Sequence, residues 1–401
     1  MASHPQTLLL GGHEPLVGKD KYLGGVLARD GCVYALPGNA ERVLKIDPKR
    51  GRCELIGPRF PGKFKWLRGV LGDDGAIYGI PCWAETVLKI VPETGECTTI
   101  GGPFPGEWKW HGGVAVGGAI YGIPADAEAV LKITPATGEV TTFGGPLPGR
   151  SKWYGGLLGG NGCIYGTPTC AEAVLKIDPV AGRVEQLGSL PKGGYKWHGC
   201  VVGSDGAIIG IPCNADCVLR VDPADDSVTL HGKGVVKTGR HRSDGKYKFL
   251  GGVLGGDGKT YCIPSDSDYV LRVGTGKDPV VENIGRSLEN EKWQQNKWQN
   301  GFLGADGYIY GIPLKAENVL RVCCDTGEVS TVGGPFPGHN KWEGGVVAGD
   351  GALYCMPLKA HYVMKIVPSD EKAVARVRRA RHVALALLGA CSLVSLYRAR
   401  G

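Results

Sequence analysis

The 401-residue sequence lacks the short motifs that identify many hydrolases, metalloproteases and nucleotide-binding enzymes. It has no GxSxG elbow, no HExxH, no GxGxxG opening a helix and no P-loop lysine. Its nine histidines form no spaced motif, and no pair of CxxC spacings marks a zinc site. No catalytic constellation can therefore be named from motifs, and we expect neither a metal nor a cofactor.

The chain also has little net charge outside its last residues. The total is +7, and seven Lys/Arg and one Glu among residues 371–401 account for +6 of it, which leaves +1 for residues 1–370. A nearly neutral body does not favour nucleic-acid binding. Residues 1–10 lack the basic start and long apolar run of a secretory signal. We therefore expect the 14 cysteines to be reduced, mostly packed thiols in a cytoplasmic protein.

Glycine, in contrast, is abundant, and the reason is an internal repeat. The 67 glycines exceed twice the usual share, while 42% hydrophobic residues are enough for a core, so many tight turns are favoured over disorder. A lysine followed by an aromatic residue recurs at intervals of 43 to 52 residues. The eight lysines are Lys21, Lys65, Lys109, Lys152, Lys196, Lys248, Lys297 and Lys341.

Each repeat contains four short apolar runs separated by turn residues. In the repeat from Lys65 to Trp108 the runs span residues 67–71, 76–80, 87–91 and 96–100. Asp74-Gly75 lies between the first two runs, where it predicts a hairpin turn. Four antiparallel strands in about 44 residues are typical of one propeller blade, which must stack against neighbours to bury its faces.

Counting strands predicts how the ring closes. The first seven repeats have four runs, whereas the repeat from Lys341 has three and ends at Pro368. Residues 7–10, followed by Gly11-Gly12, match the missing fourth run. The sequence therefore predicts an eight-bladed all-β propeller over residues 1–368, with its last blade completed by the N-terminal strand and no free edge. A seven-bladed ring with a spare repeat is the alternative, and it would leave an unpaired sheet.

The string KWxGGVLxxDGxIYGIPxxAxxVLKIDPxTGEVxxxGGPxPG resembles propeller repeats found in predicted proteins of unicellular algae. The resemblance covers roughly residues 7–368 and implies no established activity. At the level of the fold alone, the chain is also similar to kelch, regucalcin/gluconolactonase-like and streptogramin-lyase-like propellers. Fold does not decide function.

Two charged columns recur in the repeats. An acidic residue, such as Glu41 or Glu85, is followed four positions later by Lys or Arg, such as Lys45 or Lys89. We expect the acidic column to share one rim with the lysines of the Lys-aromatic pairs. A ligand surface is one interpretation, and a repeated surface salt bridge is the favoured one.

Function is expected where the repeats differ. The residue after each aromatic varies, and it should lie around the mouth of the central tunnel, where convergent polar groups can fix a ligand. His111 and His198 are candidate bases, and Glu343 is a candidate partner for a cation. Tyr154, Gln299 and Asn300 are candidate ligand-binding residues. These candidates are weighed against a purely structural role, which is favoured.

Two long connections between repeats also break the pattern. The first, residues 232–247, is basic and contains Arg240, Arg242 and Lys246, which we predict as an anion or partner contact and otherwise as a solvated insertion. The second spans residues 286–296. We expect substitution of the three basic residues to change stability little.

After Pro368 the composition changes to a basic and apolar tail, residues 369–401. The uncharged residues 383–397 would form a helix of about 22 Å, shorter than the roughly 30 Å hydrocarbon core of a membrane. A tail anchor, a helix on a surface and a poorly ordered extension all remain open, so membrane contact through the tail is one prediction.

The sequence therefore favours a monomeric, noncatalytic binding or protein-interaction propeller that uses the face bearing the connections between blades. Its partner would be a protein or a small molecule. The alternative is a small-molecule enzyme, lactonase-, esterase- or lyase-like, with its site at the tunnel mouth around His111, His198 and Glu343.

Overall fold

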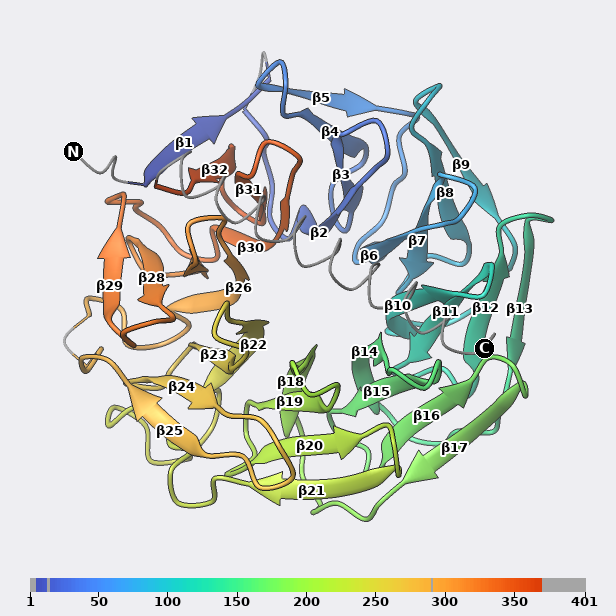
Figure 1. Cartoon of the computed structure of the whole chain (residues 1–401). Helices are drawn as coiled ribbons and strands as arrows, with labels where there is room; N and C mark the ends of the chain where they lie inside the picture. Colours follow the sequence, from blue (N-terminus) through green and yellow to red (C-terminus); the bar gives the residue numbers. More distant parts are fainter. Residues whose placement is uncertain (1–4, 13–14, 290, 370–401) are drawn as a thin grey trace, which may run out of the picture.

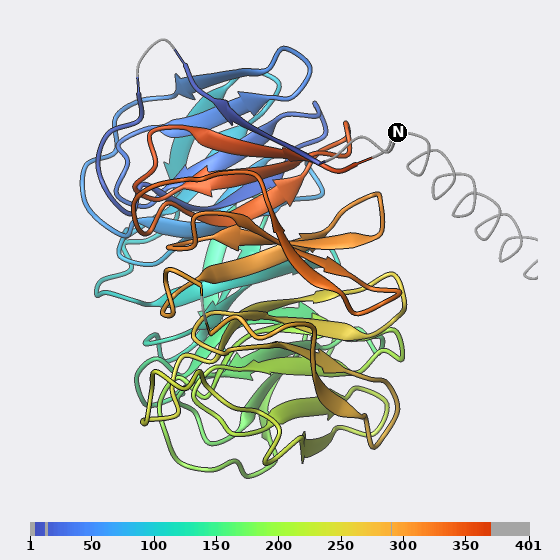
Figure 2. The same ribbon diagram turned by 90° about the vertical axis from the view of Figure 1, so that its left-hand side faces the viewer.

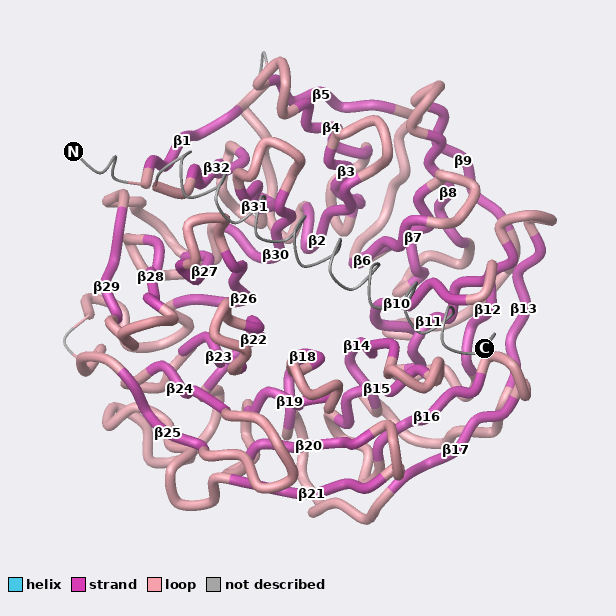
Figure 3. The backbone as a smooth tube through the Cα atoms, viewed as in Figure 1, coloured by secondary structure: helices cyan, strands magenta, loops and turns pink. Residues whose placement is uncertain are grey.

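The computed structural model describes residues 5–12, 15–289 and 291–369, and in these residues all regular elements are strands (Figure 3). They form eight four-stranded antiparallel sheets arranged around a central axis (Figure 1). The eight-bladed propeller predicted from the repeats is thus confirmed. We number the blades 1 to 8 along the chain, beginning at Lys21.

In each blade the strands follow one another from the axis outwards. The innermost strands are β2 (Tyr22–Leu27), β6 (Trp66–Leu71), β10 (Trp110–Val116), β14 (Trp153–Leu158), β18 (Trp197–Val202), β22 (Phe249–Leu254), β26 (Trp298–Leu303) and β30 (Trp342–Val347). The second strands are β3 (Val33–Pro37), β7 (Ile77–Pro81), β11 (Ala119–Pro124), β15 (Ile164–Pro168), β19 (Ile208–Pro212), β23 (Thr260–Pro264), β27 (Tyr308–Pro313) and β31 (Leu353–Pro357). The third strands are β4 (Val43–Asp47), β8 (Val87–Val91), β12 (Val130–Thr134), β16 (Val174–Asp178), β20 (Val218–Asp222), β24 (Val270–Val273), β28 (Val319–Cys323) and β32 (Val363–Val367). The outer strands are β5 (Arg52–Ile56), β9 (Glu96–Ile100), β13 (Glu139–Phe143), β17 (Arg183–Leu187), β21 (Ser227–His231), β25 (Val281–Ile284), β29 (Val329–Val332) and, for blade 8, β1 (Gln6–Leu10).

The N-terminal strand closes the ring as the sequence predicted. β1 pairs antiparallel with β32, from Gln6 opposite Val367 to Leu10 opposite Val363, and becomes the fourth strand of blade 8. Figure 2 shows this strand beside the C-terminal strands of the same blade. The outer edge of β32 is therefore paired, which removes a site for aggregation.

The aspartate of each hairpin turn fixes the turn and the next strand together. In blade 2, Asp74 accepts the Ala76 N–H at 3.1 Å with one carboxylate oxygen and the Tyr78 hydroxyl at 2.7 Å with the other. Gly75 has a φ of +86°, a conformation that costs glycine little. This explains why Asp-Gly recurs between the first two strands of most blades.

The faces of adjacent sheets pack into a continuous core. Tyr34 and Leu36 of blade 1, for example, pack with Trp66 and Ile77 of blade 2, and all four are at least 98% buried. Large aromatic side chains of this kind supply much of the apolar surface buried between blades. The described cysteines are free and mostly buried within the same layers.

The repeated lysines occupy a different place from the one expected. We predicted that they lie on a rim, but all eight are 4% exposed or less. The Lys65 ammonium donates to the carbonyl oxygens of Gly38 at 2.8 Å, Ala40 at 3.0 Å and Gly62 at 2.9 Å, which join blades 1 and 2. All eight lysines are thus internal, and that prediction was wrong. Every one except Lys297, whose ammonium donates to Gln294, also donates to a carbonyl oxygen of the preceding blade.

The second basic column does form surface ion pairs, although with other carboxylates. Lys45 lies 3.7 Å from Asp30, and Lys89 lies 3.4 Å from Asp74, both aspartates of hairpin turns. Glu41 of the acidic column instead pairs with the exposed Arg59. These contacts support the favoured interpretation of partly exposed salt bridges, each worth about 1 kcal/mol or less.

Candidate functional site

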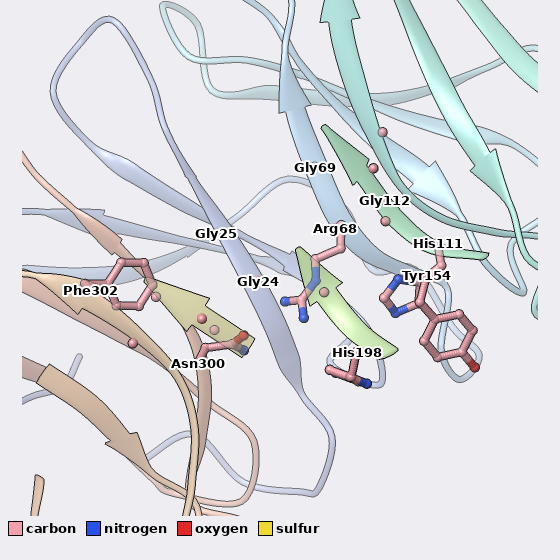
Figure 4. A pocket seen from close by; sticks show the side chains of 18 residues that line it. Gly24, Gly25, Arg68, Gly69, His111, Gly112, Tyr154, His198, Asn300 and Phe302 are labelled. Atoms are coloured by element: carbon pink, nitrogen blue, oxygen red, sulfur yellow. The ribbon is translucent and has the colours of Figure 1, made fainter. Parts of the chain in front are cut away.

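The eight inner strands surround a central channel with a cavity of about 420 Å³. Most of its wall is glycine backbone, because the inner strands carry glycine at the two positions closest to the axis in most blades. Six larger residues interrupt this wall and are shown in Figure 4: Arg68, His111, Tyr154, His198, Asn300 and Phe302. The cavity therefore loses the symmetry of the ring that forms it.

A β-bulge in each inner strand determines which residues reach the channel. In blade 3, Trp110 lies opposite Pro124 and Gly113 lies opposite Gly122, so β10 contains one extra residue at this point. Such a bulge bends the strand and re-aims a side chain. Gly112 adopts a φ of +74° in the bulge, while His111 lies on the channel wall.

Arg68 takes the place of the bulge glycine in blade 2. Its guanidinium fills space that two other blades leave open, because a Cβ added to Gly24 or to Gly344 would lie 2.9 Å from Arg68 Nη1. Nη1 donates to the Leu23 carbonyl oxygen, and Nη2 lies 3.3 Å from Glu343 Oε1. The side chain thus extends from blade 2 past blade 1 to a carboxylate of blade 8.

Three aromatic rings form the opposite part of the wall. His111 and Tyr154, from adjacent blades, stack with ring centroids 4.3 Å apart and planes 4° apart. The His198 ring is tilted by 69° to that of Tyr154, at 6.3 Å. Figure 4 shows the Arg68 guanidinium between these rings and the Asn300 amide. The channel therefore has an aromatic side and a polar side.

Burial keeps the aromatic side uncharged near neutral pH. Loss of hydration, and then the positive charge of Arg68, lowers the pKa of His111 to about 3 and that of His198 to about 4. Burial also raises the pKa of Tyr154 to about 12. His111 Nδ1 is buried and has no hydrogen-bond partner among the described residues.

The polar side holds one positive and one negative group. Burial raises the pKa of Glu343, and the neighbouring Arg68 opposes that shift. The ion pair is partly accessible, because 27% of the Arg68 side chain and 12% of the Glu343 side chain are exposed. Asn300 has a φ of +57°, which asparagine tolerates better than most residues, and its side chain lies over Gly251.

The structure brings together many of the residues singled out from the sequence. His111, Tyr154, His198 and Asn300 line the channel, and Glu343 reaches it through Arg68.

Other candidate residues lie elsewhere. Gln299 is 8% exposed and is not part of the channel wall. In the basic connection, Arg240 lies 3.3 Å from Glu289, and Arg242 lies 2.9 Å from the buried Asp266 and 2.6 Å from Asp244. These two guanidinium groups therefore already have carboxylate partners, while Lys246 is exposed.

Sequence reasoning missed Arg68 and Phe302. The signal was present for Arg68, because arginine stands at a position that is glycine in most blades. Phe302 stands where other blades have valine or leucine, so it followed the apolar pattern and gave no such signal.

Across residues 5–12, 15–289 and 291–369, no three His, Cys, Asp or Glu side chains are grouped to hold a metal ion. The same residues contain no helix of the length and apolarity needed to cross a membrane. The predictions made for the tail, residues 371–401, lie outside the described part of the chain.

Comparison with known proteins identifies the fold but no sequence family. No family model and no curated protein matches this chain. A streptogramin B lyase aligns with a TM-score of 0.57 and 15% identity over 90% of this chain and 97% of the lyase. A second match is a catalytically inactive histidine-to-alanine variant of virginiamycin B lyase from Staphylococcus aureus, crystallised with quinupristin. It aligns with a TM-score of 0.57 and 14% identity over 91% of this chain and 99% of the variant.

A computationally designed protein, Ika8, aligns with a TM-score of 0.63 and 9% identity over 90% of this chain and 99% of the design. At these identities the likeness shows the propeller fold alone. The predicted similarity to streptogramin-lyase-like propellers is therefore confirmed at the level of the fold, while the resemblance to algal repeats stays a prediction.

Proposed function

We propose that this protein is a noncatalytic binding propeller whose small-molecule ligand occupies the central channel, entered from the face that bears the connections between blades. The observation that carries the proposal is the broken symmetry of the channel wall. Blades that are otherwise nearly alike differ where Arg68, His111, Tyr154, His198 and Asn300 replace glycine or leucine.

The size and chemistry of the cavity support this proposal. A volume of about 420 Å³ lies within the range of small-molecule sites, roughly 300–1,000 Å³. Such sites combine apolar and aromatic walls with a few polar groups, as the stacked rings and the Arg68 ion pair do here. The free, mostly buried cysteines support a cytoplasmic place of action.

The repeat supplies a matched control for the test. Replacing Arg68 and Asn300 by glycine, and His111 and Tyr154 by leucine, gives each position the residue that other blades carry. We expect this symmetrised variant to fold, because glycine and leucine already occupy equivalent bulges.

Ligand-observed NMR with a fragment library should find compounds that bind the wild-type protein and not the symmetrised variant. Exposed Lys192→Ala serves as a surface control that should leave binding unchanged. Fragments that bind all three proteins equally would contradict a site in the channel.

A second candidate function is a small-molecule enzyme that uses the same channel. It is favoured by Glu343, a carboxyl group whose raised pKa suits it to donating or accepting a proton. The lowered pKa values of His111 and His198 make these imidazoles weak bases, which would bind a substrate through hydrogen bonds rather than take its proton. Turnover in a screen of lactones, esters and macrocyclic lactones, lost in His111→Leu and His198→Leu, would favour this function over simple binding.

A further inference from the structure

We infer that the ligand of this channel is an uncharged, flat heterocycle with a cis-amide edge, meaning a ring carbonyl beside a ring N–H, as in a nucleobase. This inference rests on the proposed function and specifies its ligand class. Three features of the channel lead to it: its charge balance, its stacked rings and the pairing of donors with acceptors.

The first feature is the charge balance. Arg68 and Glu343 carry opposite charges 3.3 Å apart, and the two imidazoles on the other side add no charge near neutral pH. An anionic ligand would be attracted by Arg68 but repelled by the carboxylate of Glu343 beside it. A cationic ligand would be attracted by Glu343 but repelled by Arg68. In a site partly removed from water, such like-charge contacts are costly. A ligand without net charge avoids both costs.

The second feature is the flat aromatic wall. The parallel stack of His111 and Tyr154 comes from two adjacent blades. The bulge glycines of the same two blades are also neighbours, because a Cβ at Gly112 would lie 3.5 Å from the Gly155 Cα. Aromatic faces favour offset stacking with other flat rings, which a planar ligand can offer and a branched one cannot.

The third feature is the hydrogen-bonding pattern facing this wall. The guanidinium of Arg68 has only donors, and the carboxylate of Glu343, when ionised, has only acceptors. Side by side, they match the carbonyl oxygen and the N–H of one cis-amide edge. Asn300, on the same polar side, adds an acceptor oxygen and a donor NH2 group.

Uracil is the probe that carries these features in their smallest form. Isothermal titration of the full-length protein with uracil is expected to show binding. Dimethyluracil, in which methyl groups replace both ring N–H hydrogens, is expected to bind at least about tenfold more weakly, because it has no ring N–H to donate to Glu343. Benzoate, which is flat but anionic, is also expected to bind more weakly than uracil.

Two variants test whether the polar side and the aromatic side of the channel each contribute to uracil binding. Arg68→Gly removes the polar pair, and Tyr154→Leu removes half of the stack, while both restore residues found in other blades. Each should weaken uracil binding by at least about tenfold, and Lys192→Ala should not change it. Melting temperatures of all variants, measured in parallel, separate loss of binding from loss of folding.

The outcomes distinguish this inference from the proposed function. If dimethyluracil or benzoate binds as tightly as uracil, in a manner that depends on Arg68, the channel is a binding site but the ligand class is wrong. If uracil does not bind while fragments from the library do, the class is again overturned and the site stands. If the symmetrised variant binds everything that the wild-type protein binds, both fail together.

Discussion

Replacing His111 by leucine is expected to make the protein more resistant to acid. In the folded protein the pKa of His111 lies at about 3, because burial and Arg68 disfavour the imidazolium, whereas an unfolded histidine titrates near 6.5. Below pH 6.5 the unfolded chain therefore binds a proton that the folded protein does not. Stability falls as the pH decreases through this window, down to about pH 3.

The size of this effect follows from the same shift. Each pH unit below 6.5 costs about 1.4 kcal/mol, so His111 alone should lower the free energy of unfolding by about 2 kcal/mol between pH 7 and pH 5. Leucine occupies the equivalent position as Leu23, Leu67 and Leu250, so the variant should fold normally at pH 7.

Urea unfolding at pH 7 and pH 5 measures the difference directly. The stability of His111→Leu relative to the wild-type protein should increase by about 2 kcal/mol over this range. His339→Ala, which alters an exposed histidine, is the control. A difference that stays constant between the two pH values would mean that the folded channel accepts the imidazolium, and the description of an uncharged aromatic side would be refuted.

Three further predictions concern the scaffold. Deleting residues 1–12 removes β1, exposes the edge of β32 and should lower the melting temperature or cause aggregation, whereas unchanged melting would contradict the closure of the ring. Lys65→Met removes three hydrogen bonds, two of them to blade 1, and should lower the free energy of unfolding in urea by about 2–4 kcal/mol. A loss below about 0.5 kcal/mol would show that the tie is dispensable. Arg242→Ser should lower the free energy of unfolding in urea by about 3 kcal/mol, because Asp266 is 1% exposed and loses its ion pair with Arg242. An unchanged free energy of unfolding would instead support the solvated insertion that the sequence suggested.

The fold could be predicted because the same pattern of apolar runs and turn residues recurs eight times in the sequence. Asp74-Gly75 and its equivalents mark one hairpin per unit, and the missing fourth strand of blade 8 has a counterpart at Gln6–Leu10. Each feature is local in sequence, so a single chain was enough to count strands and to assign the partner of β32.

The repeated lysines show where this reasoning ends. They were placed on a rim because they follow the connections between blades, which share a face with the loops between the second and third strands. Lys65 instead uses its long apolar stem to bring the ammonium to three carbonyl groups near the loop of blade 1. A buried ammonium with such acceptors cannot be distinguished from an exposed one by residue type.

The candidate site illustrates the same limit at the channel. Residues after each aromatic were expected at the tunnel mouth, and His111, Tyr154 and His198 do line it, whereas Gln299 is buried. The backbone of the bulge does not account for this difference, because Gly112 after His111 and Asn300 after Gln299 both have a positive φ. The sequence gives the residue at each position of a repeat, but not the direction of its side chain.

Arg68 shows how the two kinds of information combine. Its place in a column of glycines was visible in the sequence, yet its importance depends on Gly24 and Gly344, which leave the space that its guanidinium fills. Glycine at those two positions thus leaves room for a side chain from another blade. A side chain at either position would displace Arg68 from Glu343, so the broken symmetry involves three consecutive blades and not one substitution.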